Sequence, residues 1–304
     1  MIKNIYIFGS SGFIGNEISE YFKTKKNSFK IINIDKKNYD LLKISSFKKL
    51  EKKIKNNSII LFCSGIKKQL GDNLEVYNKN MSIINNFILS IKKRKKLSII
   101  YFSSAAVYGE DFNHKSKIKE LTNTNIKTFY GCAKINSEII LKKFCEEKFF
   151  RLSVIRFPLI YGYNDASKGY GPTKFFFNFI NKEKIVLWGD GTELREFIYI
   201  KDIPKFVYLV IKNNFEGTIN FASGKSYSYI ETIKILEKLN GANCEVIGKK
   251  RSKSKVNHYF NNKKLKKIFP KFRFTKLDLA LKDMIKIHKR KKNNNEKKIH
   301  KRKK

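Results

Sequence analysis

The N-terminal stretch IYIFGSSGFIG (residues 5–15) constrains the fold more than any other part of the chain. A short apolar run leads directly into Gly9, Gly12 and Gly15, and an amphipathic stretch follows. Glycines in this position permit a tight turn, which lets the backbone approach a diphosphate. The free N–H groups and the positive dipole end of a helix N-terminus then stabilise its charge. The segment, spaced G-x-x-G-x-x-G, therefore predicts a strand–turn–helix unit that binds a dinucleotide.

An acidic residue after the second apolar run supports this interpretation. KIINID (30–35) ends at Asp35, twenty residues after Gly15. A carboxylate there can accept hydrogen bonds from an adenosine ribose. The same carboxylate would repel a 2′-phosphate, so the pattern favours NAD over NADP, even though Lys36 and Lys37 follow. The alternative is an aspartate that faces only solvent at the end of a strand.

The first half of the chain alternates short apolar runs with amphipathic stretches, which is typical of parallel βαβ units. We expect strands at 5–8, 30–34, 59–63, 98–103 and 152–157, and helical segments that include 17–24 and 80–93. This alternation breaks after about residue 160. The predicted fold class is α/β: a Rossmann-type doubly wound parallel sheet with a smaller C-terminal α/β substrate-binding domain.

A Tyr-x-x-x-Lys pair is the main catalytic candidate. The strand at 98–103 leads into Ser103 and Ser104, and serines at the carboxyl end of a central parallel strand face the ligand crevice. Tyr130 begins the next amphipathic stretch, and Lys134 lies one turn later on the same helical face. The same spacing begins at five other tyrosines that lack this context: Tyr21, Tyr39, Tyr170, Tyr208 and Tyr259.

The pair has a chemical rationale. A phenol with its ordinary pKa near 10 is a poor base at pH 7, and lowering that pKa by ~3 units takes ~4 kcal/mol. A nearby ammonium and an oxidised nicotinamide together could supply this stabilisation. We therefore interpret Tyr130 as the base that takes a proton from a substrate hydroxyl while hydride leaves the same carbon. Ser104 would hold the oxygen by a hydrogen bond.

The formal net charge of +40 suggests a nucleic-acid partner, but its distribution argues against one. Of the 66 basic residues only 8 are arginine, which leaves 66 − 8 = 58 lysines, and most are scattered along the chain. Lysine, isoleucine, asparagine and phenylalanine are all abundant here, and all four have A/T-rich codons. We therefore attribute the charge to coding bias and solvated faces, and expect no nucleic-acid partner.

Cysteine spacing and hydropathy predict a reduced, cytoplasmic protein. The four cysteines form no C-x-x-C pair and show no metal-ligand spacing with the four histidines, so we expect no metal site. The apolar run before Gly9 has only four residues (5–8), too few for a signal peptide. No stretch approaches the ~18 uncharged apolar residues needed to cross a bilayer, so we expect no membrane insertion.

Five motifs in order resemble the extended short-chain dehydrogenase/reductases: GSSGFIG, Asp35, SSAAVYG (103–109), YGCAK (130–134) and PLIYG (158–162). WGDGTELREFIYIKD (188–202) resembles the branch of that family that modifies nucleotide sugars, with enzymes similar to UDP-glucose 4-epimerase. The resemblance runs from residue 1 to about 285. It implies a cytoplasmic NAD enzyme, with a role in polysaccharide biosynthesis, whose substrate is a nucleotide-diphosphate sugar.

The resemblance also implies the site residues. The catalytic trio would be Ser104, Tyr130 and Lys134, and the substrate would contact Ser104, Tyr130, Arg195 and Arg251. Arginine suits the diphosphate because its planar fork binds phosphate oxygens in pairs. The cofactor would be bound by Gly9, Ser11, Gly12, Phe13, Ile14, Gly15, Asp35, Asp40, Leu41, Ser64, Gly65, Asn80, Ser103, Tyr130, Lys134 and Pro158.

Departures from the family pattern narrow the function. Relatives that dehydrate sugars carry an Asp-Glu pair where this chain has Ala105 and Ala106, so 4,6-dehydration lacks its acid and base. Leu159 replaces an asparagine common in the family. The leading hypothesis is an NAD-dependent nucleotide-sugar epimerase, acting at C4 through a transient keto-sugar. The alternatives are an NAD(P)H-dependent 4-keto reductase and, less favoured, a non-catalytic NAD-sensing or nucleic-acid-binding scaffold.

The resemblance implies a domain plan as well. The NAD-binding Rossmann domain would comprise residues 1–160, with 198–222 returning to it. The substrate-binding domain would comprise 161–197 and 223–288. The sequence of 289–304 has almost no apolar residue and predicts a disordered basic tail. Family similarity further implies a homodimer formed through the helices at 80–93 and 130–145.

Overall fold

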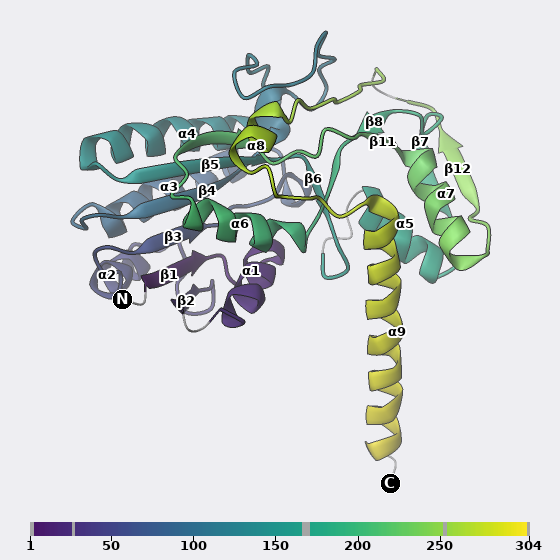
Figure 1. Ribbon diagram of the computed structural model, residues 1–304, viewed down its shortest axis with the longest axis horizontal. Helices are drawn as coiled ribbons and strands as arrows, with labels where there is room; N and C mark the ends of the chain where they lie inside the picture. The colour runs from purple at the N-terminus through teal and green to yellow at the C-terminus, as the bar shows by residue number, and fades with distance from the viewer. Residues whose placement is uncertain (1–2, 26–27, 166–170, 252–253, 303–304) are drawn as a thin grey trace.

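A central sheet of six parallel strands organises the molecule (Figure 1). The computed structural model describes residues 3–25, 28–165, 171–251 and 254–302, with side chains up to residue 294. The strand order is β10-β5-β4-β3-β1-β2. The strands are β1 (Lys3–Phe8), β2 (Phe29–Ile34), β3 (Ile59–Phe62), β4 (Ser98–Ser104), β5 (Arg151–Phe157) and β10 (Gly217–Asn220). All five strands expected in the first half are present.

Helices cover both faces of this sheet because the strands are apolar on both sides. In β1, Ile5 and Ile7 face one core while Tyr6 and Phe8 face the other. The first core is closed by α1 (Phe13–Lys23) and α6 (Asp202–Lys212). The second is closed by α2 (Ile44–Lys53), α3 (Leu74–Ile91) and α4 (Phe129–Lys148). The predicted doubly wound Rossmann-type sheet is confirmed.

The order of the strands reverses at β1, which pairs with β2 on one side and β3 on the other. Ligands of open α/β sheets bind at such a switch point, outside the carboxyl ends of the strands. Here the glycine turn follows β1, and Gly9 donates a backbone hydrogen bond to Ile34 O at 2.9 Å. Cys63, which follows β3, donates to Phe8 O at 3.0 Å. The topology thus places the turn directly over the crevice.

Most of the second half forms a smaller lobe beside the sheet (Figure 1). Its short strands pair two by two: β6 (Leu159–Tyr161) with β9 (Phe197–Tyr199), β7 (Ile185–Trp188) with β12 (Val246–Lys249), and β8 (Leu194–Arg195) with β11 (Tyr227–Ser228). Helices α5 (Gly171–Ile180), α7 (Tyr229–Asn240) and α8 (Lys263–Ile268) and the turns η1 (Lys68–Leu70) and η2 (Ala105–Tyr108) complete the described elements. Between these segments, β10 adds the sixth strand to the central sheet. Residues 166–170, which include Tyr170 of one of the other Tyr-x-x-x-Lys spacings, lie outside the described residues.

The C-terminal segment differs from the sequence-based expectation. Helix α9 runs from Leu277 to Arg302, so the chain is helical through most of the stretch predicted to be a disordered tail. Leu281 and Met284 are fully buried and anchor the first turns. Ile285 also packs into the core, and the rest of the helix contains neither glycine nor proline and is rich in lysine, a good helix former. None of the described helices has both the length and the apolar character needed to cross a membrane.

Candidate active site

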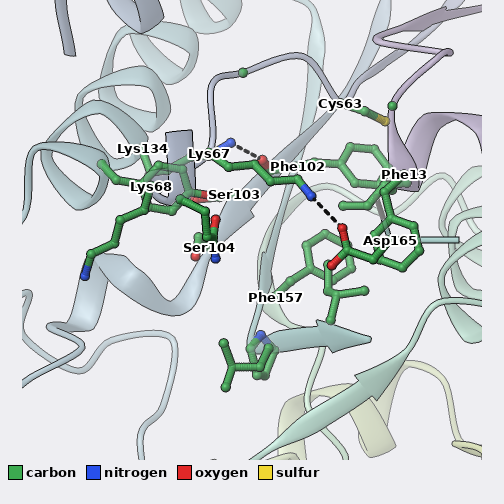
Figure 2. Close-up of a pocket in the computed structure, with 18 of the residues that line it drawn as sticks. Phe13, Cys63, Lys67, Lys68, Phe102, Ser103, Ser104, Lys134, Phe157 and Asp165 are labelled. Atoms are coloured by element: carbon green, nitrogen blue, oxygen red, sulfur yellow. Dashed lines mark hydrogen bonds and ion pairs between the residues drawn. The ribbon is translucent and has the colours of Figure 1, made fainter. Parts of the chain in front are cut away.

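A cavity of about 240 Å³ lies at the carboxyl ends of the strands, at the switch point (Figure 2). It brings together the glycine turn, the end of β4, the start of α4 and the segment after β5. Eleven of the residues expected from the sequence line it: Gly9, Gly12, Phe13, Ile14, Gly15, Gly65, Ser103, Ser104, Tyr130, Lys134 and Pro158. Segments far apart in the chain therefore converge on one cavity.

The glycine turn is as tight as its sequence indicates. Gly9 has φ +79°, a left-handed conformation that favours glycine. A Cβ atom on Gly15 would lie 2.2 Å from the carbonyl oxygen of Gly9. The turn leads into α1, whose first-turn N–H groups have no partner within the helix. These residues therefore form a cradle that suits the diphosphate of NAD.

Tyr130 lies in the first turn of α4 and is fixed there by its backbone. Its N–H donates to Asp72 Oδ1 at 2.9 Å, and Thr128 Oγ1 caps the helix by accepting from the N–H of Gly131 at 3.0 Å. A Cβ on Gly131 would lie 2.9 Å from the carbonyl oxygen of Ala106. The glycine after Tyr130 thus allows the helix to pack directly against η2, next to Ser104.

Lys134 is held one helical turn further on. Its ammonium donates to the carbonyl oxygen of Phe102 at 2.7 Å and lies 5.8 Å from the centroid of the Tyr130 ring (Figure 2). It also lies 5.0 Å from the ring centroid of Tyr101. The lysine is therefore anchored to β4 and its charge faces the phenol.

Burial dominates the electrostatics of this pair. It raises the pKa of Tyr130 to about 12; a hydrogen bond with Ser104 opposes the rise, and the charge of Glu110 adds to it. Burial also lowers the pKa of Lys134 to about 8. The sequence-based expectation of a depressed phenol pKa is therefore not met by the protein's own groups. Further positive charge must enter the site before Tyr130 can act as a base near pH 7.

A buried polar network supports the serines from behind. Arg156 of β5 forms an ion pair with Glu138 of α4 at 2.6 Å, and both side chains are more than nine-tenths buried. Ser103 donates a hydrogen bond to the same carboxylate. Arg156 also donates to the hydroxyl oxygen of Tyr108 at 2.7 Å. This network joins β4, α4, β5 and η2, and so fixes the strand end that presents Ser104.

Two further expected residues, Ser64 and Asn80, line a small adjoining cavity together with Gly65, Tyr130 and Lys134. The amide of Asn80 bonds twice to one residue: it accepts from Ile66 N at 2.8 Å and donates to Ile66 O at 3.2 Å. Asn80 therefore holds the loop after β3 in place.

Four residues expected at the cofactor lie outside this cavity. Asp35 follows β2 beside the glycine turn, and its carboxylate accepts from the backbone and side chain of Asn38 at 3.0 and 3.1 Å. Asp40 accepts from Leu42 N at 3.1 Å. Ser11 is exposed on the turn, and Leu41 is 8% exposed with its side chain in the core beneath α3. The side chain of Leu41 therefore packs in the hydrophobic core and does not face the cavity.

The two expected diphosphate arginines have different surroundings. Arg195 lines a second cavity that also includes Ser104; its guanidinium donates to Leu194 O at 3.0 Å and forms a longer ion pair with Glu193 at 3.8 Å. Arg251 lines neither cavity. It pairs with Glu193 at 2.6 Å and with Asp190 at 3.4 Å, so its fork is already occupied by carboxylates.

Charged residues that the sequence did not single out also line the first cavity. Lys67 pairs with Asp165 at 3.1 Å beside Phe13, and its ammonium lies 5.6 Å from the centroid of the Phe13 ring (Figure 2). Lys68 pairs with Glu110. Both lysines belong to CSGIKKQLGDN (63–73), the segment that follows β3. The sequence motifs gave no signal for them.

Comparison with known proteins agrees with this geometry. The family model described as NAD dependent epimerase/dehydratase family matches residues 5–222. An uncharacterized UDP-glucose epimerase of Bacillus subtilis is 23% identical over 273 residues, covering 78% of this chain and 82% of the relative. The ADP-L-glycero-D-manno-heptose-6-epimerase of Brachyspira hyodysenteriae is 27% identical, covering 77% and 80%.

Solved structures share the fold over almost the whole chain. The UDP-N-acetylglucosamine 4-epimerase of Methanobrevibacter ruminantium, in complex with UDP-N-acetylmuramic acid, superposes with a TM-score of 0.80 at 24% identity, covering 94% of this chain and 97% of that one. The UDP-glucose 4-epimerase of Thermotoga maritima, with UDP-glucose, gives a TM-score of 0.80 at 18% identity, covering 95% and 99%.

Proposed function

The chain belongs to the NAD dependent epimerase/dehydratase family, and we propose that it is a nucleotide-sugar epimerase that acts at C4 through a transient keto-sugar. One observation carries the proposal. Ser104, Tyr130 and Lys134 meet the glycine turn on a single cavity, while alanines occupy the positions where dehydrating relatives carry an acid and a base. The residues needed for reversible oxidation of a hydroxyl are present, and those needed to expel water are replaced.

The cofactor of this family is NAD, and the glycine cradle at the start of α1 fits its diphosphate. When bound, NAD supplies a reversible acceptor for hydride from the sugar carbon. Phe13, Ile14 and Gly15 would hold the diphosphate through backbone N–H groups. Gly65 and Pro158 would line the far part of the cavity.

The protein's own residues would move the proton. Ser104 would hold the reacting sugar oxygen, and Tyr130 would take its proton and later return it. The charge of Lys134 would stabilise the phenolate in the interval. Epimerisation requires that the keto-sugar turn over between the two transfers, so we assign it to the second cavity, which adjoins Ser104 and has a volume of about 400 Å³.

The substrate would extend from Ser104 towards Arg195 on the second lobe. Several relatives are named for UDP, GDP or ADP sugars, which fits a nucleotide-diphosphate substrate here. Arg195 lines the cavity and is suited to the diphosphate. We assign Arg251 a supporting role, because its pairs with Glu193 and Asp190 link β12 to the segment before β8.

Substitution of the base tests the proposal. Tyr130→Phe should lower turnover by about 10³-fold, the loss typical of a missing general base, with NAD retained. The control is Tyr208→Phe, because Tyr208 has the same spacing to Lys212 but lies on α6, away from both cavities. Turnover is followed by NMR of candidate nucleotide sugars. Full activity of the Tyr130→Phe protein would refute the mechanism.

The fate of the cofactor separates epimerase from reductase. An epimerase regenerates its NAD in each cycle and should retain it through purification. Denaturing the purified protein and identifying the released nucleotide by mass spectrometry measures this directly. NAD at close to one equivalent supports the proposal, whereas preference for added NADPH with none retained would indicate a keto-reductase.

We also propose a homodimer formed through α3 and α4. Leu89 on α3 and Ile139 on α4 are exposed apolar side chains on these packed helices. Light scattering should report a dimer for the native protein and a monomer for Ile139→Glu. Ile44→Glu, at an exposed apolar position on α2, is the control and should stay dimeric. A monomeric native protein would contradict the proposal.

A further inference from the structure

The second cavity, introduced above, contains polar groups that the proposed mechanism does not use. It shares Ser104, Phe157 and Pro158 with the first cavity and extends to Arg195, Glu196 and His258. Two buried polar atoms on its walls, Glu196 Oε2 and His258 Nε2, have no hydrogen-bond partner within the part of the chain that the structure describes. Buried polar atoms are almost always paired, so these two indicate an interaction that the protein alone does not complete.

Glu196 joins β8 to β9 and is 1% exposed. One of its oxygens, Oε1, accepts from the backbone N–H of Gly224 at 3.0 Å and from that of Ser223. The other oxygen, Oε2, accepts a hydrogen bond from neither of these N–H groups. The two amides therefore fix the orientation of the carboxyl group and leave one oxygen available.

The unpaired oxygen is where a proton would reside. Two N–H donors point at Oε1, so that oxygen must remain an acceptor, and protonation of Glu196 can occur only at Oε2. Burial raises the pKa of Glu196 to about 7, against the opposing hydrogen bonds from Ser223 and Gly224. Near neutrality the group is thus a partly neutral acid whose O–H is a donor without an acceptor.

His258 presents the complementary atom. Its Nε2 atom is buried and has no hydrogen-bond partner among the described residues. Burial, aided by the charge of Arg195, lowers the pKa of His258 to about 4, so the ring is neutral above pH 5.

We infer that Glu196 binds the substrate as a neutral carboxylic acid, donating from Oε2 to an oxygen of the nucleotide sugar, while His258 Nε2 forms a hydrogen bond with one of its hydroxyl groups. The inference rests on the proposed function and adds a recognition element to it. A ligand moiety rich in hydroxyl groups satisfies both atoms at once. A neutral acid also avoids placing a carboxylate next to the anionic diphosphate.

Other ionisable groups face Glu196 and could contribute to pH dependence. The same cavity is lined by Lys68, Glu110, Asp111, Arg195 and His258, and His114 stacks near His258 with ring centroids 6.3 Å apart. The charge of Lys117 also acts on Glu196. The test must therefore remove the titration of Glu196 alone.

The substitution Glu196→Gln removes the titration of Glu196 alone. Its amide oxygen can accept from the backbone N–H groups of Ser223 and Gly224, and its NH₂ then replaces the O–H donor at every pH. Calorimetry measures the Kd of the NAD-loaded protein for UDP-glucose, UDP-N-acetylglucosamine and GDP-mannose at pH 6.0 and pH 8.5. The diphosphate diester of these probes does not titrate in this range. Glu183→Gln, at an exposed carboxylate remote from both cavities, is the matched control.

For the native protein and Glu183→Gln, a donor with a pKa near 7 predicts that Kd rises by about 30-fold from pH 6.0 to pH 8.5. Glu196→Gln should change less than about threefold and should bind more tightly than the native protein at pH 8.5. His258→Phe should weaken binding by about tenfold at both pH values. A purely structural Glu196 would not produce tighter binding on substitution.

Two results would overturn the inference while leaving the proposed function intact: a native Kd that does not vary with pH, or the same variation in Glu196→Gln. In the second case another group on the cavity is the one that titrates. Failure of the native protein to bind any of the three probes at either pH would instead refute the proposed function, and the inference with it.

Discussion

Replacing Lys134 by methionine should move the pH dependence of catalysis as well as lower its rate. Methionine keeps much of the length of the side chain and removes its charge. Burial, the hydrogen bond of Ser104 and the charge of Glu110 together set the pKa of Tyr130 at about 12, so acting as a base near pH 7 requires ~5 units, or ~7 kcal/mol, of further phenolate stabilisation.

The distance between Lys134 and Tyr130 determines how much of this phenolate stabilisation Lys134 can supply. Its ammonium lies 5.8 Å from the centroid of the Tyr130 ring. Coulomb's law with an effective dielectric constant of ~20 gives ~3 kcal/mol for opposite unit charges at that separation, or ~2 pKa units. The remaining ~4 kcal/mol must come from the bound cofactor, because the hydrogen bond of Ser104 is already included in the pKa of about 12.

The assay is the pH profile of kcat/KM for the nucleotide sugar that the native protein turns over. In Lys134→Met the rising limb, which reports deprotonation of Tyr130, should shift upward by ~2 units, and activity at pH 7 should fall by ~100-fold. Activity should then recover about tenfold per pH unit towards pH 9. The native protein should lose this assistance as pH rises past the lowered pKa of Lys134, which is about 8, because the ammonium becomes neutral.

Lys134→Arg, which keeps the charge, is the control, and the rising limb of its kcat/KM profile should lie near the same pH as in the native protein. Because Lys134 also donates to the carbonyl oxygen of Phe102, retention of NAD must be measured for both variants. A Lys134→Met profile that is lower but unshifted would refute the electrostatic reasoning, since it would show that the lysine contributes position and no charge.

Two further substitutions test the cradle and the network behind the serines. Gly15→Ala should abolish NAD retention, because the added Cβ would lie 2.2 Å from a backbone oxygen of the turn; Gly248→Ala, whose nearest neighbour would be 3.5 Å away, should retain it. Mass spectrometry of the nucleotide released on denaturation measures NAD retention in both variants. NAD retained by Gly15→Ala would show that the turn can widen to accept the added Cβ. Glu138→Leu should lower the free energy of unfolding in urea by about 3–5 kcal/mol, because it leaves the buried Arg156 charge unpaired. A loss below about 1 kcal/mol would mean that Arg156 finds other partners.

Local sequence patterns were sufficient to predict the secondary structure elements that form the cofactor-binding half of this protein. The apolar run before Gly9 and the spacing of Gly12 and Gly15 specify a strand, a tight turn and a helix, because each property depends on residues adjacent in the chain. Tyr130 and Lys134 share a helical face for the same reason. The order of strands and the convergence on one cavity then follow from the rules that govern parallel sheets.

The C-terminal helix shows where local reasoning fell short. The composition of 289–304 predicted disorder, yet the helix continues as far as Arg302. The buried apolar start of α9, at Leu281 and Met284, provides the nucleus that a lysine-rich segment lacks alone. Once nucleated, helix adds one hydrogen bond per residue, which composition alone does not reveal.

The sequence by itself determined the fold class, the glycine cradle and the candidate trio. Only the tertiary structure decided which charged residues face a ligand. It placed Arg195 on a cavity and engaged Arg251 with carboxylates, and it left one oxygen of Glu196 without a partner among the described residues. The physical reason is that pairing, burial and the resulting pKa values depend on residues far apart in the chain. The motif TELREF shows that an arginine and a glutamate are adjacent in the chain. Their burial, their hydrogen-bond partners and their pKa values depend on the residues that surround them in the folded protein.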